Sequence, residues 1–152
     1  MYKVRLSVLA LALLALGACS KSSGGDQSGN GENGGNLPLA EAGNELADIN
    51  FEFDSSALSQ SSQSTLRSDG RWLLDNPGRN VVVEGHCDER GTAEYNLALG
   101  ERRAQSAFDF LRSLGVKEGQ MKTVSYGEEL PLDPGHTESS WSKNRRAHFS
   151  TK

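Results

Sequence analysis

The sequence predicts an α/β fold of the α+β type: a two-layer sandwich in which helices cover one face of a four-stranded mixed sheet. Four short segments have the period-2 alternation or the β-branched composition of strands. They occupy residues 49–54, 81–86, 121–126 and 146–151. Two longer segments with helical periodicity separate the first three strands, and a short one precedes the last. The 152 residues contain no repeat, so the order βαβαβ(α)β fits one domain with a leader.

The first strand and the first helix follow from a change of period. Residues 49–53 alternate apolar and polar side chains, and Asp54 ends the strand. Residues 58–76 carry leucines and a tryptophan among serines, glutamines and arginines, and an Asn-Pro-Gly sequence stops them. They predict a surface helix with one apolar stripe. Residues 37–48 are expected to form a short lead-in helix.

The second strand leads into the longest predicted helix. Residues 81–86 begin with three valines, the pattern of a largely buried strand. Thr92 is placed to cap a helix that Gly115 closes, and Glu94 in the first turn suits the helix dipole. The spacing of apolar residues assigns its core-facing stripe to Leu97, Ala104, Phe108 and Leu111.

The last third of the chain predicts strand, loop, short helix and strand. Residues 121–126 form the third strand, and a loop rich in proline and aspartate follows Gly127. Residues 139–145 are expected to make a short helix with Trp141 packing inward. Residues 146–151 complete the sheet.

The N-terminus has the features of an export signal. Residues 1–18 start with Lys3 and Arg5, continue with an apolar run and end in small residues. The run is too short to span a bilayer as a mature helix. Residues 16–19, Leu-Gly-Ala-Cys, resemble the lipobox of bacterial lipoproteins. That resemblance implies cleavage before Cys19 and acylation of Cys19 by palmitate-type chains.

Residues 19–36 are expected to be the lipidated end and a flexible tether, because they contain no large apolar side chain. Such a tether spans roughly 23 Å on average. In bacterial lipoproteins Ser20, where an aspartate would favour the inner membrane, implies the outer membrane. The predicted organisation is therefore a signal peptide at 1–18, a tether at 19–36 and a domain at 37–152.

Charge and cysteine content restrict the function further. The net charge is −4, and losing Lys3 and Arg5 with the signal makes the mature chain more negative, which argues against a nucleic-acid partner. If Cys19 is acylated, Cys87 has no disulfide partner. Cys87 then reads as a small residue at a strand end rather than a redox group.

Opposite charges gather within residues 86–104. Asp88 comes just after the second strand, at the side of an α/β sheet where ligands usually bind. Arg102 and Arg103 point about 100° apart on the next helix, so at most one faces the same cleft. A carboxylate and a guanidinium together suit a zwitterion, whose ammonium and carboxylate they would pair with. On residue types alone, a structural salt bridge or two solvated charges remain an open alternative.

Metal binding and hydrolysis fit the sequence less well. Residues 86–89, His-Cys-Asp-Glu, are metal-type ligands, but neighbours on an extended chain point to alternate sides and do not converge. His136 and His148 have no readable nucleophile or base partner. We therefore expect no metal and no cofactor.

Four sequence blocks carry a family resemblance. They read GHCDERGT at 85–92, EYNLALGERRA at 94–104, VSYG at 124–127 and KNRRA at 143–147. In this order they resemble the OmpA-like C-terminal domain family and, within it, the peptidoglycan-associated lipoproteins of the Tol-Pal system. The resemblance covers residues 51–149 as well as the lipobox, and it implies the OmpA-like sandwich.

The resemblance also implies a ligand. In the family, the acid of the Gly-His-x-Asp motif and the second arginine of the helix hold meso-diaminopimelate of the peptidoglycan stem peptide. These positions are Asp88 and Arg103 here, and the family's aspartate after the first strand is Asp54, with Phe53 beside it. Diaminopimelate carries an ammonium and a carboxylate on one carbon, which agrees with a zwitterion site.

Two further motif residues are read as scaffold. Asn96 and Arg145 match the family pattern, and their hydrogen bonds are expected to fix the loop that carries Asp88. Cys87 stands where threonine or alanine is also common, which leaves the site intact. His148 stands where the last strand is usually apolar, which concerns local packing only.

The implied function is a non-enzymatic lipoprotein of the outer membrane. Its domain lies in the periplasm and holds the membrane to peptidoglycan through diaminopimelate. The resemblance further implies TolB and TolA as partners and a role in cell division. Two alternatives stay open: a protein-interaction module that binds the wall only incidentally, and an envelope hydrolase.

Overall fold

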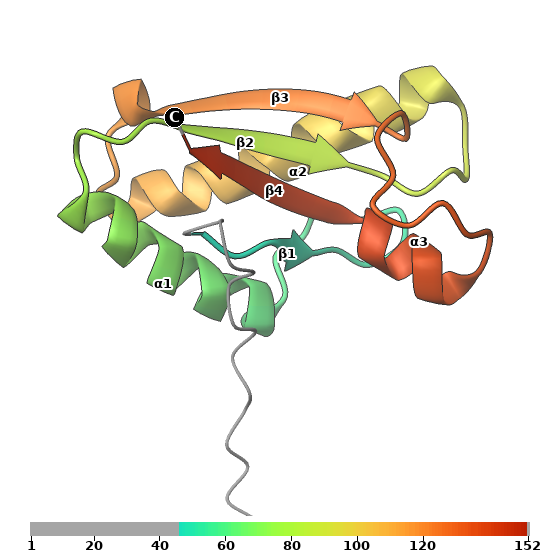
Figure 1. The fold of residues 1–152 in the computed structure, drawn as a ribbon, viewed down its shortest axis with the longest axis horizontal. Coiled ribbons are helices and arrows are strands. Elements are labelled where there is room, and N and C mark those ends of the chain that lie inside the picture. The colour runs from blue at the N-terminus through green and yellow to red at the C-terminus, as the bar shows by residue number, and fades with distance from the viewer. Residues whose placement is uncertain (1–45, 152) are drawn as a thin grey trace, which may run out of the picture. The chain divides into compact units, whose positions relative to one another are not determined.

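The computed structural model describes residues 46–151 (Figure 1). The elements in chain order are β1 (Ile49–Asn50), α1 (Gln60–Asp75), β2 (Val81–His86), α2 (Ala93–Ser113), the 3₁₀ turn η1 (Glu118–Gln120), β3 (Met121–Gly127), α3 (Glu138–Asn144) and β4 (Arg146–Thr151). The predicted signal peptide, Cys19 and the tether lie outside the described residues. So does most of the predicted lead-in helix, and its described end, residues 46–48, is not helical.

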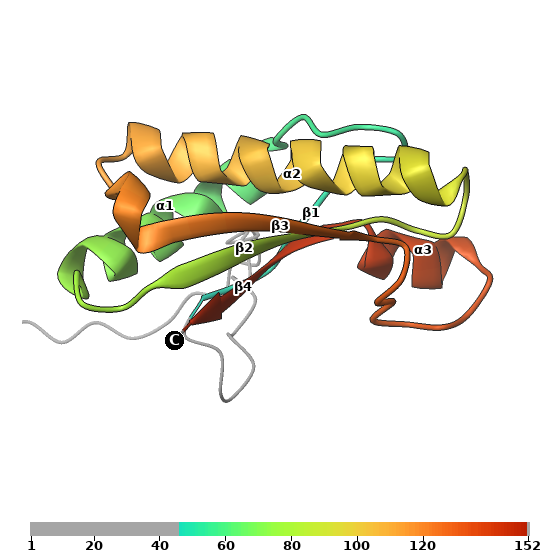
Figure 2. The ribbon, with the colours of Figure 1, turned by 90° about the horizontal axis from the view of Figure 1, so that it is seen from above.

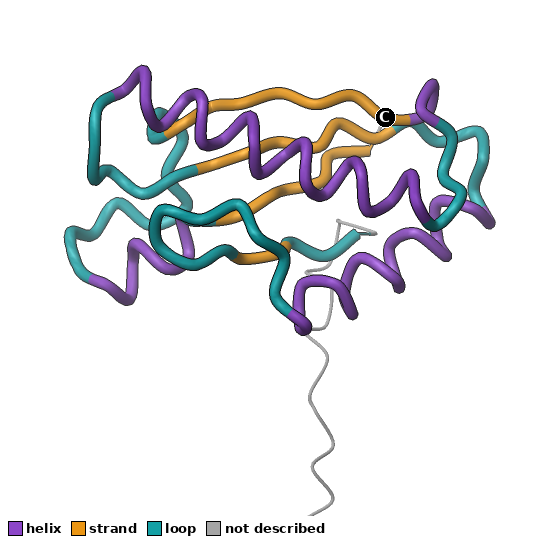
Figure 3. Tube along the Cα trace, turned by 180° about the vertical axis from the view of Figure 1, so that it is seen from behind, coloured by secondary structure: helices purple, strands orange, loops and turns teal. Residues whose placement is uncertain are grey.

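The sheet is mixed and four-stranded, as predicted. Its strand order is β1-β4-β2-β3, with β2 parallel to β3 and β4 antiparallel to both β1 and β2. The helices α1 and α2 pack on one face, and α3 lies at the end of the sheet where β2 and β3 finish (Figures 2 and 3). The predicted fold class is therefore confirmed.

The core lies between the sheet and the two long helices. It is built from inward-facing aliphatic and aromatic side chains of both layers. The fully buried ones include Leu66, Leu73, Val81, Val83, Leu111 and Phe149. The strand residues among them follow the period-2 alternation, because successive side chains point to opposite faces of a sheet.

Two glycines let α2 lie directly on the backbone of β2. A Cβ added to Gly85 would stand 1.8 Å from the Gly100 carbonyl oxygen, and one added to Gly100 would stand 2.3 Å from Ser125 Oγ. Neither position can hold a larger side chain in this arrangement. This contact fixes α2 so that Asn96 and Arg103, about one turn to either side of Gly100, lie under the end of β2.

The inward face of α2 differs from the prediction. Leu97, assigned to the core, is 52% exposed, and Phe108 is only partly buried. Ala104 and Leu111 are buried as predicted, and the other buried positions of α2 are Asn96, Leu99, Gly100, Arg103 and Ala107. The prediction followed apolar residues only, whereas the helix turns polar residues inward to bond the loops of the site.

Two smaller expectations were also wrong. The first strand is shorter than predicted, because the chain leaves the sheet after Asn50 and Asp54 takes a left-handed backbone conformation with φ 53°. Trp141 is half-buried and lies outside the hydrophobic core.

The predicted cap of α2 is confirmed. The Thr92 Oγ1 accepts the Tyr95 N–H at 3.2 Å.

Candidate functional site

A pocket of about 210 Å³ opens where β2 ends and α2 begins. Its wall comes from the β1–α1 loop, the β2–α2 loop, α2 and Arg145, which lies between α3 and β4. The lining residues are Phe53, Asp54, Cys87, Asp88, Arg90, Gly91, Tyr95, Asn96, Leu99, Arg103 and Arg145. All six residues predicted to bind or to support the ligand thus surround one cavity.

Asp88 is only 3% exposed, yet it is well supplied with donors. Its Oδ1 accepts Arg90 N at 3.1 Å and Arg90 Nε at 3.2 Å, and its Oδ2 accepts Arg90 Nη2 at 2.6 Å and Arg145 Nη1 at 3.1 Å. Burial by itself would raise the pKa of Asp88, but these hydrogen bonds outweigh burial and hold the pKa below its ordinary value. Asp88 is therefore a carboxylate at neutral pH.

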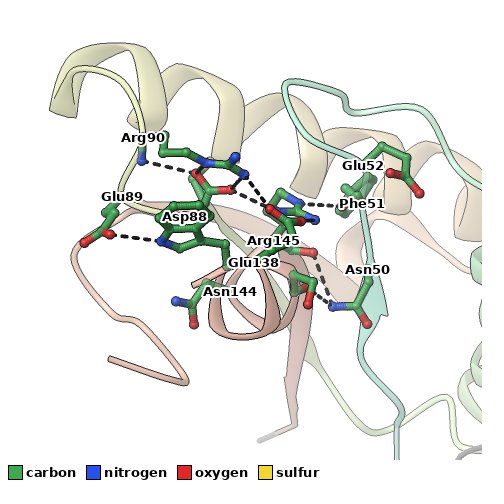
Figure 4. A network of polar contacts seen from close by, with 12 residues as sticks. Asn50, Phe51, Glu52, Asp88, Glu89, Arg90, Glu138, Asn144 and Arg145 are labelled. Carbon is green, nitrogen blue, oxygen red and sulfur yellow. Dashed lines mark hydrogen bonds and ion pairs between the residues drawn. The ribbon is translucent and has the colours of Figure 1, made fainter. Parts of the chain in front are cut away.

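Arg145 ties this carboxylate to the rest of the fold (Figure 4). Its Nε donates to the Phe51 carbonyl at 3.0 Å, and its Nη2 donates to Glu138 at 2.7 Å. The side chain is 6% exposed. Arg145 thus joins α3, the β1–α1 loop and Asp88.

Arg103 is completely buried and forms no ion pair with a carboxylate of the described residues. Its Nε donates to the Ser55 carbonyl at 2.9 Å, its Nη2 to the Glu52 carbonyl at 3.1 Å and its Nη1 to the His86 carbonyl at 2.8 Å. Nη1 also lies 3.3 Å from Cys87 Sγ. Burial lowers the pKa of Arg103 from its ordinary value, but a guanidinium keeps its proton in proteins. The pocket floor therefore carries a positive charge that is not paired with a carboxylate from the described part of the chain.

Asn96 holds the loop that carries Asp88. Its Nδ2 donates to the carbonyls of Asp88 and Arg90 and to Glu128. The thiol of Cys87 donates to the Asn96 carbonyl at 3.3 Å, and burial raises the pKa of that thiol. Asn96 therefore connects α2 to the loop after β2, and Cys87 is a buried free thiol beside it.

The mouth of the pocket is formed by exposed aromatic side chains. Phe53 is 55% exposed and Tyr95 is 45% exposed. The Tyr95 hydroxyl donates to Asp54, which connects α2 to the β1–α1 loop. The predicted residues Phe53 and Asp54 therefore lie at the rim rather than at the floor.

Arg90 is the main site residue that the sequence reading missed. Besides pairing with Asp88, its guanidinium lies 4.0 Å from the Phe53 ring centroid and 4.3 Å from that of Trp141. Its position two residues after Asp88 was a usable signal, because a side chain so close in sequence can fold back on the carboxylate. Tyr95 and Glu138 were missed as well, and nothing in their local sequence marks them.

Two features are not found among residues 46–151. No group of three His, Cys, Asp or Glu side chains in this range could hold a metal ion. No helix of this range has the length and apolar content needed to cross a bilayer.

Sequence comparisons identify relatives of this chain. The OmpA family matches residues 50–145. The peptidoglycan-associated lipoprotein of Pseudomonas aeruginosa is 42% identical over 95% of both chains, and that of Haemophilus influenzae is 41% identical over 95% of both.

Solved structures show the same fold. The crystal structure of the peptidoglycan-associated lipoprotein from Burkholderia pseudomallei is 42% identical and gives a TM-score of 0.67, covering 69% of this chain and 89% of that one. The C-terminal domain of Helicobacter pylori MotB is 21% identical with a TM-score of 0.66, covering 70% of this chain and 84% of that one. At that identity the second likeness concerns the fold alone.

Proposed function

The chain belongs to the OmpA family and, within it, to the peptidoglycan-associated lipoproteins, and from this premise we propose that it anchors the outer membrane to peptidoglycan. The domain binds the wall through the pocket at the end of β2. The observation that carries the proposal is the charge pattern of that pocket: an ionised Asp88 in its wall and, on its floor, a buried Arg103 that forms no ion pair with any carboxylate of residues 46–151.

The proposed ligand group is the amino-carboxylate end of diaminopimelate in the stem peptide. Its ammonium pairs with Asp88, and its carboxylate is attracted by the positive floor at Arg103. The volume of about 210 Å³ supports this choice, because it is smaller than a usual drug-sized site and fits only one end of a side chain. Phe53 and Asp54 at the rim contact the part of the peptide that stays outside.

Membrane attachment is proposed to come from lipid on Cys19. Two or more acyl chains hold a protein stably in a bilayer, at about 0.8 kcal/mol per buried methylene. A single pocket binds weakly by comparison, since each charge-assisted hydrogen bond contributes only about 1.5 to 3 kcal/mol. Many copies in one membrane facing one polymer make the attachment strong by avidity. In this proposal the protein binds peptidoglycan and does not cleave it.

Partner proteins are proposed at the same face. The exposed rings of Phe53 and Tyr95 line the pocket mouth, and exposed aromatic residues favour protein contacts. TolB is the proposed occupant, competing with the wall, and TolA the further partner in a Tol-Pal system active in cell division. A TolB titration in the presence of excess muropeptide tests the competition. Unchanged TolB affinity would contradict a shared face.

The central experiment is a sedimentation assay of the full chain with purified diaminopimelate-type wall. Asp88→Asn keeps the shape of the side chain but removes its charge, so retention should fall at least tenfold. Asp75→Asn on exposed α1 removes the same charge elsewhere and should leave retention unchanged. Equal retention of Asp88→Asn and wild type would refute the pocket as the wall-binding site.

A further inference from the structure

The carboxylate of Asp88 has no acceptor capacity left. A carboxylate offers about four lone-pair sites. Arg90 N and Nε take two of them on Oδ1, and Arg90 Nη2 and Arg145 Nη1 take two on Oδ2 (Figure 4). An incoming ammonium therefore reaches Asp88 only if one of these donors leaves.

Of the two guanidinium groups, Arg90 is the one free to leave. Arg145 is 6% exposed and is held by the Phe51 carbonyl and by Glu138. The Arg90 side chain is 31% exposed, and among the described residues its guanidinium donates only to Asp88, with Glu138 3.5 Å away as an ion pair. Releasing the Arg90 guanidinium from Asp88 breaks hydrogen bonds to that one residue and disturbs no main-chain carbonyl.

A released Arg90 stays at the pocket mouth. The rings of Phe53 and Trp141 lie about 4 Å from its guanidinium, at 4.0 and 4.3 Å, and cation–π attraction holds an arginine in such a place. Trp141 is itself fixed, because its Nε1 donates to Glu89 at 2.9 Å. The guanidinium is thus kept beside whatever occupies the pocket.

Arg103 cannot offer the same contact to a ligand. Four of its donor contacts already go to three carbonyls and one sulfur, and it is fully buried. Of five N–H groups at most one is left, so Arg103 cannot grip a carboxylate through two parallel hydrogen bonds. Arg90 has the planar fork that such a grip needs.

We infer that Arg90 is the specificity residue of the pocket: the ligand's ammonium replaces its guanidinium on Asp88, and the freed guanidinium pairs with the ligand's carboxylate. This inference rests on the proposed function and adds a selection rule to it. A zwitterionic amino-carboxylate end compensates both partners of the broken Asp88–Arg90 pair. A lysine-type end, which has the ammonium alone, displaces Arg90 and leaves it without a carboxylate.

The test is a calorimetric titration of the full chain, in detergent, with two soluble stem peptides that differ only in diaminopimelate or lysine. Wild type should bind the diaminopimelate peptide at least tenfold more tightly. Arg90→Gln should bind the diaminopimelate peptide at least tenfold more weakly than wild type does. It should bind the lysine peptide as tightly as wild type or more tightly, so the ratio of the two affinities approaches one. Arg71→Gln, the same charge change on the exposed face of α1, should keep the wild-type ratio.

If Arg90 had only a structural role, Arg90→Gln would weaken the binding of both peptides by the same factor. The ratio of the two affinities would then stay at its wild-type value, and that result would overturn the inference. Arg90→Lys serves as the second variant, since it keeps the charge that pairs with Asp88 but lacks the fork. It should lower the ratio, and a wild-type ratio in Arg90→Lys also contradicts the inference. Failure of wild type to bind either peptide would instead refute the proposed function.

Discussion

The two faces of the sheet bury polar side chains in different ways. On the helix-covered face, Arg103 is fully buried and its guanidinium donates to three main-chain carbonyls. On the opposite face, Arg146 is 7% exposed, but its Nε and Nη1 form no hydrogen bond, and its nearest carboxylate, Asp48, lies 3.5 Å from Nε. His86 beside it is 2% exposed, and neither ring nitrogen makes a hydrogen bond of normal geometry.

This difference distinguishes a buried side chain that holds the site in place from side chains that are only buried. Arg103 joins α2 to the loops before α1 and after β2, so its hydrogen bonds hold the pocket wall in place. Arg146 and His86 contribute burial without such bonds, and a buried polar group that lacks a partner destabilises the fold. Burial of a cation therefore does not by itself indicate a role in the site.

The largest expected effect tests the backbone contact on the helix-covered face. Gly85→Ala would place a Cβ 1.8 Å from the Gly100 carbonyl oxygen, so α2 must move away from β2. We expect a loss of about 4 kcal/mol or more in the free energy of unfolding, measured by urea denaturation. Val82→Ile on the opposite face of the same strand should change it by less than about 1 kcal/mol. Similar values for both variants would contradict the asymmetry of the two faces.

The second prediction compares the two buried arginines directly. Arg103→Met leaves the carbonyls of Glu52, Ser55 and His86 without a donor, and should cost about 3 kcal/mol of unfolding free energy. Arg146→Met removes a cation that is poorly bonded, and should change stability by less than about 1 kcal/mol in either direction.

Urea denaturation of both variants at pH 7 measures the difference. A loss for Arg146→Met as large as that for Arg103→Met would show that the hydrogen bonds do not decide the stability of these groups. The two variants also show how binding data on Arg103 should be interpreted. Because Arg103 supports the fold, a binding defect of an Arg103 variant has to be read together with its stability.

Most of the fold followed from the sequence because period-2 and helical patterns report which face is buried. The patterns failed where polar side chains take buried positions. On α2, the apolar Leu97 points outward while Asn96 and Arg103 point inward, because their hydrogen bonds to loops outweigh the burial of one leucine. Residue type cannot show this, since the loop carbonyls that they bond come from distant segments.

The site was predicted in part for a similar reason. The resemblance placed Asp88, Arg103, Asp54 and Phe53 around one pocket, and the structure brings them together. The saturation of the Asp88 carboxylate by Arg90 depends on side-chain geometry, and no spacing rule gives it. The stack of Arg90 between Phe53 and Trp141 joins residues nearly ninety positions apart, beyond the reach of any local pattern.

The smallest expected effect concerns His86 on the face opposite the helices. Burial, followed by the nearby charges of Arg146 and His148, lowers the pKa of His86 from its ordinary 6.5 to about 4, although Asp48 opposes the shift. The unfolded chain therefore binds more protons than the folded one between these values, so His86 lowers stability as the pH falls from about 6.5 to about 4.

Replacing the imidazole by a ring that cannot titrate removes this contribution. His86→Phe keeps a ring for the stack on Tyr126, whose centroid lies 5.5 Å away. Between pH 7 and pH 4.5, wild type should lose about 2 kcal/mol more unfolding free energy than His86→Phe. If His86→Phe loses as much stability as wild type over this range, a group other than His86 binds the proton that accounts for the acid sensitivity, and the prediction is wrong.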